Sequence, residues 1–281
     1  MDLPEARAKA EEWLLRTPLY EEIAGSDPKH CYHAIRALVL RATPFDAYCV
    51  ECKRAATFIP EHDETKRNLV LRGTEDAIQT YCMGSPVLVV SAACARNGSH
   101  RMQFVYLHRF KKGVWKIGQY PSLADLSIPE SKQFIKVLGQ DRVRELNTAI
   151  GLAAHGVGVG SYIYLRRIFE SLVEEAHDKA RNDGAWDDDA YQRSRMNERV
   201  TMLKGYLPAF LVEHPQLYGI LSKHVHELSE DECLRNFEAV REAILIIARD
   251  KLKAHEEQEH RERTAKLLVK INSTVNGKTG S

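Results

Sequence analysis

The chain has 281 residues, which is enough for about two domains, and 44% of them are hydrophobic, as in ordinary globular proteins. Its 40 lysines and arginines against 39 aspartates and glutamates leave a formal net charge of +1, which excludes attraction of the whole chain to nucleic acid or anionic lipid. Six cysteines are too few for a disulfide framework, so we expect reduced thiols and a cytoplasmic location. The most apolar stretch, residues 149–165, is shorter than the about 20 residues of a membrane span, so we expect no membrane contact.

Helices are predicted in residues 1–44, because apolar residues recur there at intervals of three and four. From Phe45 the period changes to two and turn residues separate short segments, which predicts an antiparallel β unit over residues 45–121. Helical spacing returns in residues 122–260, where several apolar stripes predict an antiparallel bundle. The last segment, residues 261–281, predicts a flexible tail.

Four residues of the β unit have the types and the spacing of a zinc ribbon. Cys49 and Cys52 form a C-x2-C pair, and Cys94 and His100 form a C-x5-H pair. Zn²⁺ prefers four thiolate or imidazole ligands in a tetrahedron, and a two-residue spacer lets one tight turn supply two of them. The sequence therefore predicts a structural Zn²⁺ site, with Cys82 as a substitute ligand. The alternative is that Cys94 and His100 are unrelated to the C-x2-C pair, which lies far from them in the sequence.

Two polar groups in the helical half are candidate catalytic residues. Arg166, Arg167 and Glu170 follow one another on one predicted helix, and they either point into a cleft of the bundle or form an ordinary surface ion pair. His226 has Lys223 three residues before it, a neighbourhood that suits a general acid or base. The alternative for His226 is an exposed histidine at a helix end.

Three features together resemble a bacterial domain family of unknown function that combines an N-terminal zinc ribbon with a HEPN-like helical bundle. They are the ribbon, the Tyr120-Pro121 pair after it, and the sequences LRRIFE at 165–170 and ILSK-x2-HE at 220–227. The resemblance implies an α+β fold: a small antiparallel zinc ribbon followed by an all-α HEPN-like antiparallel helical bundle. Members of the family occur beside restriction and other anti-phage systems, and several HEPN relatives are metal-independent ribonucleases that act as dimers.

Active HEPN nucleases carry the motif Arg-x4-6-His late in the bundle, where the arginine steadies the phosphate and the histidine moves protons. This chain departs from that motif at His226, because the nearest preceding cation is Lys223, which lacks the bidentate guanidinium fork. Arg249 and His255 do fit Arg-x5-His, although a motif this short also arises by chance.

We therefore expect a regulatory or binding module, for a protein partner or nucleic acid, in a bacterial defence or stress system, and we expect a homodimer. The first alternative is a metal-independent endoribonuclease that uses the arginines, lysine and histidines named above. A weaker alternative is a small-molecule sensor with a cleft beneath the glycine run at 156–160, which lacks the Lys-Ser/Thr of a phosphate loop.

Overall fold

The computed structural model describes residues 1–40, 43–61, 64, 68, 85–109, 111–183, 186–222 and 229–276. The chain divides into two compact units. The first unit comprises Met1–Glu130 and Asn147–Ser161, and the second comprises Ser131–Leu146 and Tyr162–Ser281.

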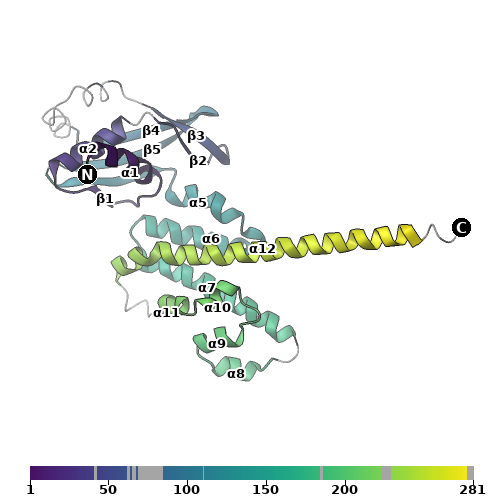
Figure 1. Cartoon of the computed structure of the whole chain (residues 1–281). Helices are drawn as coiled ribbons and strands as arrows, with labels where there is room; N and C mark the ends of the chain where they lie inside the picture. Colours follow the sequence, from purple (N-terminus) through teal and green to yellow (C-terminus); the bar gives the residue numbers. More distant parts are fainter. Residues whose placement is uncertain are drawn as a thin grey trace. The chain divides into compact units, whose positions relative to one another are not determined.

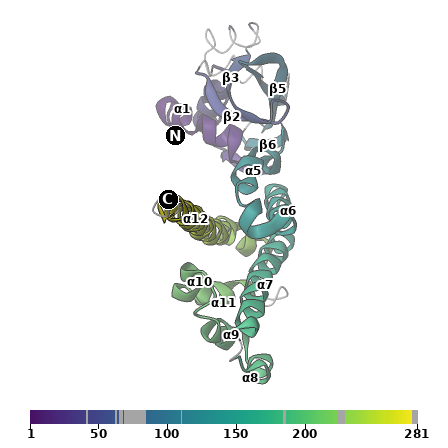
Figure 2. The same cartoon turned by 90° about the vertical axis from the view of Figure 1, so that its right-hand side faces the viewer.

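A six-stranded antiparallel sheet lies at the centre of the first unit, with the strand order β1-β6-β5-β4-β3-β2. The sheet curls into a half-barrel (Figure 1 and Figure 2). Its strands are β1 (Glu22–Ala24), β2 (Phe45–Cys49), β3 (Arg54–Glu61), β4 (Val87–Cys94), β5 (Asn97–Arg109) and β6 (Gly113–Tyr120).

The predicted fold class, a small zinc ribbon followed by an all-α HEPN-like bundle, was wrong. The structure has a six-stranded curled sheet between residues 22 and 120, followed by a helical C-terminal region. Two features hid the size of the sheet. β1 has three residues and lies between two helices, so it gives no alternating pattern of its own. It pairs with β6 through Glu22 and Trp115, a contact that no local sequence signal records.

One face of the sheet and two N-terminal helices enclose the core of the first unit. Helices α1 (Leu3–Leu15) and α2 (Pro28–Val39) each have an aspartate N-cap and a proline within the first two helical positions, an arrangement that suits the first helical turn. Buried and exposed residues alternate along β3 and β4, as expected for a sheet that is covered on one face. Buried side chains from the helices and strands of this core include Trp13, Leu14, Ile35, Leu38, Phe58, Phe104 and Tyr106.

A buried lysine of β6 binds the C-terminal end of α1. The Nζ of Lys116 donates to the backbone oxygens of Leu14 and Thr17, over 2.7 and 2.8 Å, and the side chain is fully buried. Burial lowers the pKa of Lys116 to about 7, although Glu21 opposes this shift. Tyr106 adds a hydrogen bond from its hydroxyl to the backbone oxygen of Trp13 at 3.1 Å. These bonds satisfy carbonyl groups that a helix end leaves without partners, so polar contacts as well as apolar packing fix α1 on the sheet.

The helices after the sheet differ widely in length. They are α5 (Leu123–Lys132), α6 (Ile135–Ala154), α7 (Gly158–Asn182), α8 (Asp188–Arg193), α9 (Met196–Met202), α10 (Ala209–Glu213), α11 (Gln216–Ser222) and α12 (Glu230–Asn276). Within the described part of the chain, no helix combines the length and the hydrophobicity that crossing a bilayer requires.

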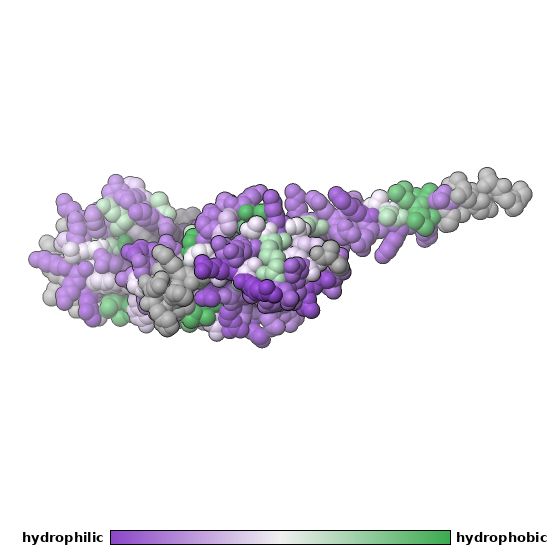
Figure 3. Space-filling view, turned by 90° about the horizontal axis from the view of Figure 1, so that it is seen from below, coloured by the Kyte–Doolittle hydropathy of each residue, from purple (hydrophilic) through white to green (hydrophobic). Residues whose placement is uncertain are grey.

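Helix α12 has a partly buried first half and an exposed second half. Only one face of the first half is buried, including Val240, Ile244, Ile247 and Ala248, whereas every described side chain from 256 to 272 is exposed. Hydrophobic side chains gather near its far end in the space-filling view (Figure 3). They belong to Leu267, Leu268, Val269 and Ile271.

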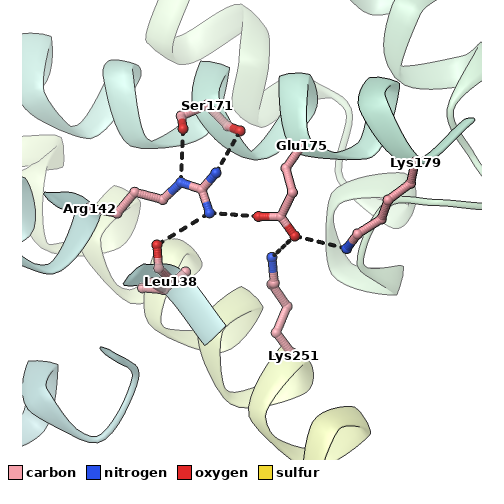
Figure 4. Close-up of polar contacts among 6 residues, drawn as sticks. All are labelled: Leu138, Arg142, Ser171, Glu175, Lys179 and Lys251. Atoms are coloured by element: carbon pink, nitrogen blue, oxygen red, sulfur yellow. Dashed lines mark hydrogen bonds and ion pairs between the residues drawn. The ribbon is translucent and has the colours of Figure 1, made fainter. Parts of the chain in front are cut away.

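A half-buried carboxylate joins three helices of the second unit (Figure 4). Glu175 on α7 accepts from Arg142 on α6 at 2.6 Å and from Lys251 on α12 at 2.7 Å, and Lys179 adds a contact at 2.8 Å. Arg142 also donates to the hydroxyl and the backbone oxygen of Ser171, both at 2.9 Å. Three cations therefore meet one carboxylate, which fixes α6 and α12 against α7.

The pKa shifts of Glu175 and Lys251 show how this cluster contributes to stability. Burial by itself raises the pKa of Glu175, but the bonds from Lys179, Lys251 and Arg142 outweigh it and lower the value to about 2. Burial also lowers the pKa of Lys251, and the attraction to Glu175 does not fully offset this effect. The ionised carboxylate of Glu175 therefore stabilises the folded state. Lys251 contributes less than its short contact with Glu175 suggests, because its own burial is unfavourable.

We expect Glu175→Gln to lower the free energy of unfolding by about 2 kcal/mol at pH 7, since one pKa unit corresponds to about 1.4 kcal/mol and Lys251 offsets part of the shift. Because the pKa of Glu175 is lowered in the folded state, its contribution is present above the ordinary value of 4.5 and is lost as the pH falls towards 2. Urea denaturation at pH 7 and at pH 3 measures the difference.

The matched control is Asp141→Asn, which removes an exposed i,i+3 ion pair with Arg144. Exposed pairs of this kind contribute about 0–1 kcal/mol, so this variant should unfold like the original chain. Equal losses in the two variants would contradict the role given to Glu175.

Candidate metal centre

The first two predicted ligands lie on the turn between β2 and β3. Cys49 is the last residue of β2, and it pairs with Arg54, the first residue of β3. Cys52 lies in the turn, and its backbone N–H donates to the sulfur of Cys49 at 3.4 Å. Lys53 completes the turn with a φ of 55°, in the left-handed region. The turn therefore folds around the Cys49 sulfur and brings the second thiol to the same side.

The other two ligands come together through an irregular hairpin between β4 and β5. Cys94 pairs with Asn97, but its neighbour Ala93 pairs with Arg101. Adjacent residues of β4 thus pair with residues of β5 that are four positions apart. The three residues of β5 in between, Gly98 to His100, form a bulge. The bulge lets the imidazole of His100 turn back towards the thiols instead of following the ladder.

Both turns lie at the same end of the sheet, because β2, β3, β4 and β5 are sequential antiparallel neighbours. The structure brings all four predicted ligands together there. The Nδ1 of His100 lies 3.3 Å from the Cys52 sulfur and 3.7 Å from the Cys49 sulfur, and the sulfurs of Cys52 and Cys94 are 4.0 Å apart. All four ligand atoms lie within 4.8 Å of one another.

These spacings fit a tetrahedral ion. With metal–sulfur bonds of about 2.3 Å and metal–nitrogen bonds of about 2.0 Å, adjacent ligand atoms are about 3.5–3.8 Å apart. The cluster can therefore hold a metal ion with small side-chain adjustments. Cys49 and Cys94 are each 2% exposed, and the protein supplies all four ligands, so the ion would have no open position for a substrate. A closed site of this kind stabilises a fold and does not catalyse.

The imidazole of His100 has a partner on its second nitrogen. Its Nε2 lies 3.2 Å from a carboxylate oxygen of Glu51 and 3.1 Å from the side-chain nitrogen of Asn97. When Nδ1 binds a metal, Nε2 carries the proton and donates it to Glu51, since the Asn97 nitrogen is itself a donor. Glu51 thus orients the ligand and raises its basicity. Our sequence reading missed this role, although Glu51 lies inside the C-x2-C pair.

The thiols differ in how readily they ionise. Burial, together with Cys49 and Cys94, raises the pKa of Cys52 to about 11. Burial also opposes ionisation of Cys94, but the backbone N–H groups of Asn97 and Arg96 point at its sulfur and hold its pKa below the ordinary value. Crowded thiolates repel one another, so a cation between them is needed before all three can ionise.

The candidate catalytic arginines are engaged in ion pairs. Arg166 donates to Glu170 at 2.7 Å, and Arg167 contacts Glu145 of α6 at 2.7 Å while its guanidinium lies over the ring of Tyr164. Carboxylates therefore already occupy the positions that a phosphate would take.

The alternative pair, Arg249 and His255, does not converge on one point. Arg249 lies 3.5 Å from Glu242, and His255 lies 3.3 Å from Glu259. Both residues are on α12, and the six helical steps from Arg249 to His255 separate them by about 9 Å along the axis and about 120° around it. Lys223, His226 and Cys82 lie outside the described residues.

Comparisons with other proteins add no assignment, because the chain matches no protein-family model, no curated protein and no solved structure.

Removal of the metal should destabilise the first unit. We expect Cys49→Ser, or a strong chelator, to lower the free energy of unfolding by about 3 kcal/mol or more, because the binding energy of a structural metal is also folding energy. Thermal melting followed by circular dichroism, together with metal analysis by mass spectrometry, measures both effects.

Cys31→Ser is the matched control, since the Cys31 thiol of α2 donates to the backbone oxygen of Gly25 at 2.9 Å and a hydroxyl can replace it. It should keep the metal and melt near the original temperature. Unchanged melting and metal content in Cys49→Ser would show that the cluster holds no ion.

Proposed function

We propose that this chain is a non-catalytic binding module, that structural Zn²⁺ holds its sheet, and that the metal-bearing end of the sheet binds the phosphate backbone of nucleic acid. The observation that carries the proposal is the closed four-ligand cluster together with neighbouring cations that have no ion pair among the described residues.

The ligand set favours Zn²⁺ over other common ions. Three thiols and one imidazole are soft or borderline ligands, which Mg²⁺ and Ca²⁺ disfavour. Zn²⁺ has no geometric preference of its own beyond the ligands and accepts the tetrahedral arrangement that the spacings fit.

Three cations lie on or next to the two turns that carry the cluster: Lys53 on the first turn, Arg54 at the start of β3, and Arg96 on the second turn. All three are exposed, and none has an ion pair or a side-chain hydrogen bond among the described residues. Nearby Arg101, by contrast, is paired with Glu61 at 2.9 Å. The charge that these three residues offer is therefore available to a partner.

The local charge balance favours an anionic partner, though modestly. Zn²⁺ with three thiolates carries a charge of −1, and the Glu51 carboxylate adds another negative charge. Lys53, Arg54 and Arg96 outweigh both by one positive charge. Because the whole chain is nearly neutral, this end is where contact with phosphates would be concentrated, and binding should weaken as salt rises.

A binding role suits the described residues better than a nuclease role. Arg166 and Arg167 are paired with carboxylates, and Arg249 and His255 lie apart on one helix. The homodimer and the setting in bacterial defence stay predictions.

The proposal is tested by fluorescence anisotropy with labelled single-stranded and double-stranded RNA and DNA at several salt concentrations. We expect the triple variant Lys53→Gln, Arg54→Gln, Arg96→Gln to bind at least about tenfold more weakly and the salt slope to fall by about two to three, one for each lost phosphate contact. Metal analysis should give one Zn²⁺ per chain.

The matched control is Arg7→Gln, Arg16→Gln, Lys29→Gln, which removes the same charge from exposed residues of α1, α2 and the α1 C-cap. It should bind like the original chain. Equal weakening in both variants, or no binding at low salt, would refute the proposed surface. RNA cleavage that survives a chelator would replace the binding role with the nuclease.

A further inference from the structure

In the second unit, each ring nitrogen of His177 faces a carboxylate. His177 on α7 is 1% exposed. Its Nε2 lies 2.7 Å from a carboxylate oxygen of Asp188, the first residue of α8, and its Nδ1 lies 3.4 Å from a carboxylate oxygen of Glu174. The carboxylate of Asp178 also approaches, and the ligand atoms of Glu174, His177 and Asp178 all lie within 4.8 Å of one another.

We propose that Glu174, His177 and Asp178 bind a divalent transition-metal ion through one imidazole nitrogen and two carboxylates, and that Asp188 positions the imidazole. This site is separate from the cysteine cluster in residues and in chemistry.

The first argument is the proton on the ring. The short contact at Nε2 means that this nitrogen donates to Asp188, so in the neutral ring Nδ1 is unprotonated. Its lone pair then faces the lone pairs of a Glu174 oxygen at 3.4 Å, and two acceptors repel each other unless a positive charge lies between them. A second proton or a metal ion supplies that charge. Asp178 adds a third ligand atom within 4.8 Å of the other two, which one metal ion can bind together with them and one proton cannot.

The second argument is the helix geometry. Residues 174, 177 and 178 are at positions i, i+3 and i+4 of α7, so their side chains leave the same face of the helix. A carboxylate behind a ligating histidine, as Asp188 stands behind His177, is the usual way in which proteins fix the tautomer and orientation of the ring.

The third argument is a pair of buried donors that no described residue satisfies. Tyr191 stacks on His177 with ring centres 3.8 Å apart, and within the described part of the chain neither its hydroxyl nor the indole N–H of Trp186 has a hydrogen-bond partner. A hydroxide or another anion on the metal would accept bonds from these donors.

The ligand set distinguishes this site from the cysteine cluster. One nitrogen and two carboxylate oxygens suit Mn²⁺, Fe²⁺ or Zn²⁺, and three protein ligands leave positions for water or a small anion. The site is open to solvent on the side of Glu174, whose side chain is 64% exposed, and of Asp178, which is also exposed.

The test uses the full chain with the cysteine cluster already loaded with Zn²⁺, and Mn²⁺ as the probe. Loss of the free-ion signal in electron paramagnetic resonance counts the bound Mn²⁺. We expect one Mn²⁺ per chain. Asp178→Asn should weaken binding at least about tenfold, and Asp188→Asn about 10–100-fold, the usual effect of removing a carboxylate behind a ligand.

Asp178→Asn is a safe variant for folding, because the Asp178 side chain is exposed and has no ion pair or hydrogen bond among the described residues. The control is Asp189→Asn, which removes an exposed carboxylate of α8 and should change Mn²⁺ binding by less than about twofold.

Three outcomes would overturn the proposal. If the zinc-loaded chain binds no Mn²⁺ at millimolar concentration, the imidazole of His177 is held only by hydrogen bonds to the carboxylates and the metal site does not exist. If Asp178→Asn binds Mn²⁺ as well as the original chain does, the ligand set is wrong. If Asp189→Asn weakens binding as much as Asp178→Asn, the ion is attracted only to a diffuse acidic surface.

Discussion

In the first unit, the fold crowds three thiols and an imidazole within 4.8 Å of one another. Ionised thiols repel at this distance, and neutral thiols make only weak hydrogen bonds, so the cluster by itself contributes little stability. A divalent ion reverses this balance, because it attracts all four groups at once. The β2–β3 turn positions Cys49 and Cys52, and the bulge between β4 and β5 positions His100 near Cys94. Both lie at one end of a sheet whose other contacts are mainly apolar.

Local sequence signals were sufficient to find the four residues of the cysteine–histidine cluster, which could hold a metal ion. Cys49 and Cys52 are close in the chain, so their spacing alone predicts a turn. The short spacing of Cys94 and His100 predicts the second turn in the same way. The bulge at residues 98–100 was not visible, because it depends on how β5 pairs with β4. The role of Glu51 was missed for a related reason, since a charged residue inside a turn is usually solvated.

The extent of the fold could not be predicted from such signals. β1 is three residues long and is defined by its pairing with β6. Lys116 would be assigned to the surface from its residue type, yet it is fully buried because α1 presents backbone oxygens at that point. The candidate pair Arg249 and His255 matched a motif in sequence, but a continuous helix keeps its members apart. Clusters such as Glu175 with Arg142 and Lys251 join residues from three helices, and nothing in the local pattern of any one helix indicates them.

The buried Lys116 also bears on how the chain acquires its structure during synthesis. Its bond to Leu14 joins residues 102 positions apart, and the pairing of β1 with β6 spans a similar distance. Contacts this remote in sequence form late, because the entropy of closing so long a loop must be overcome first. The N-terminal helices are made early, but they cannot dock until β6 has left the ribosome. Until then, the apolar faces of α1 and α2 lack the sheet that covers them in the folded unit.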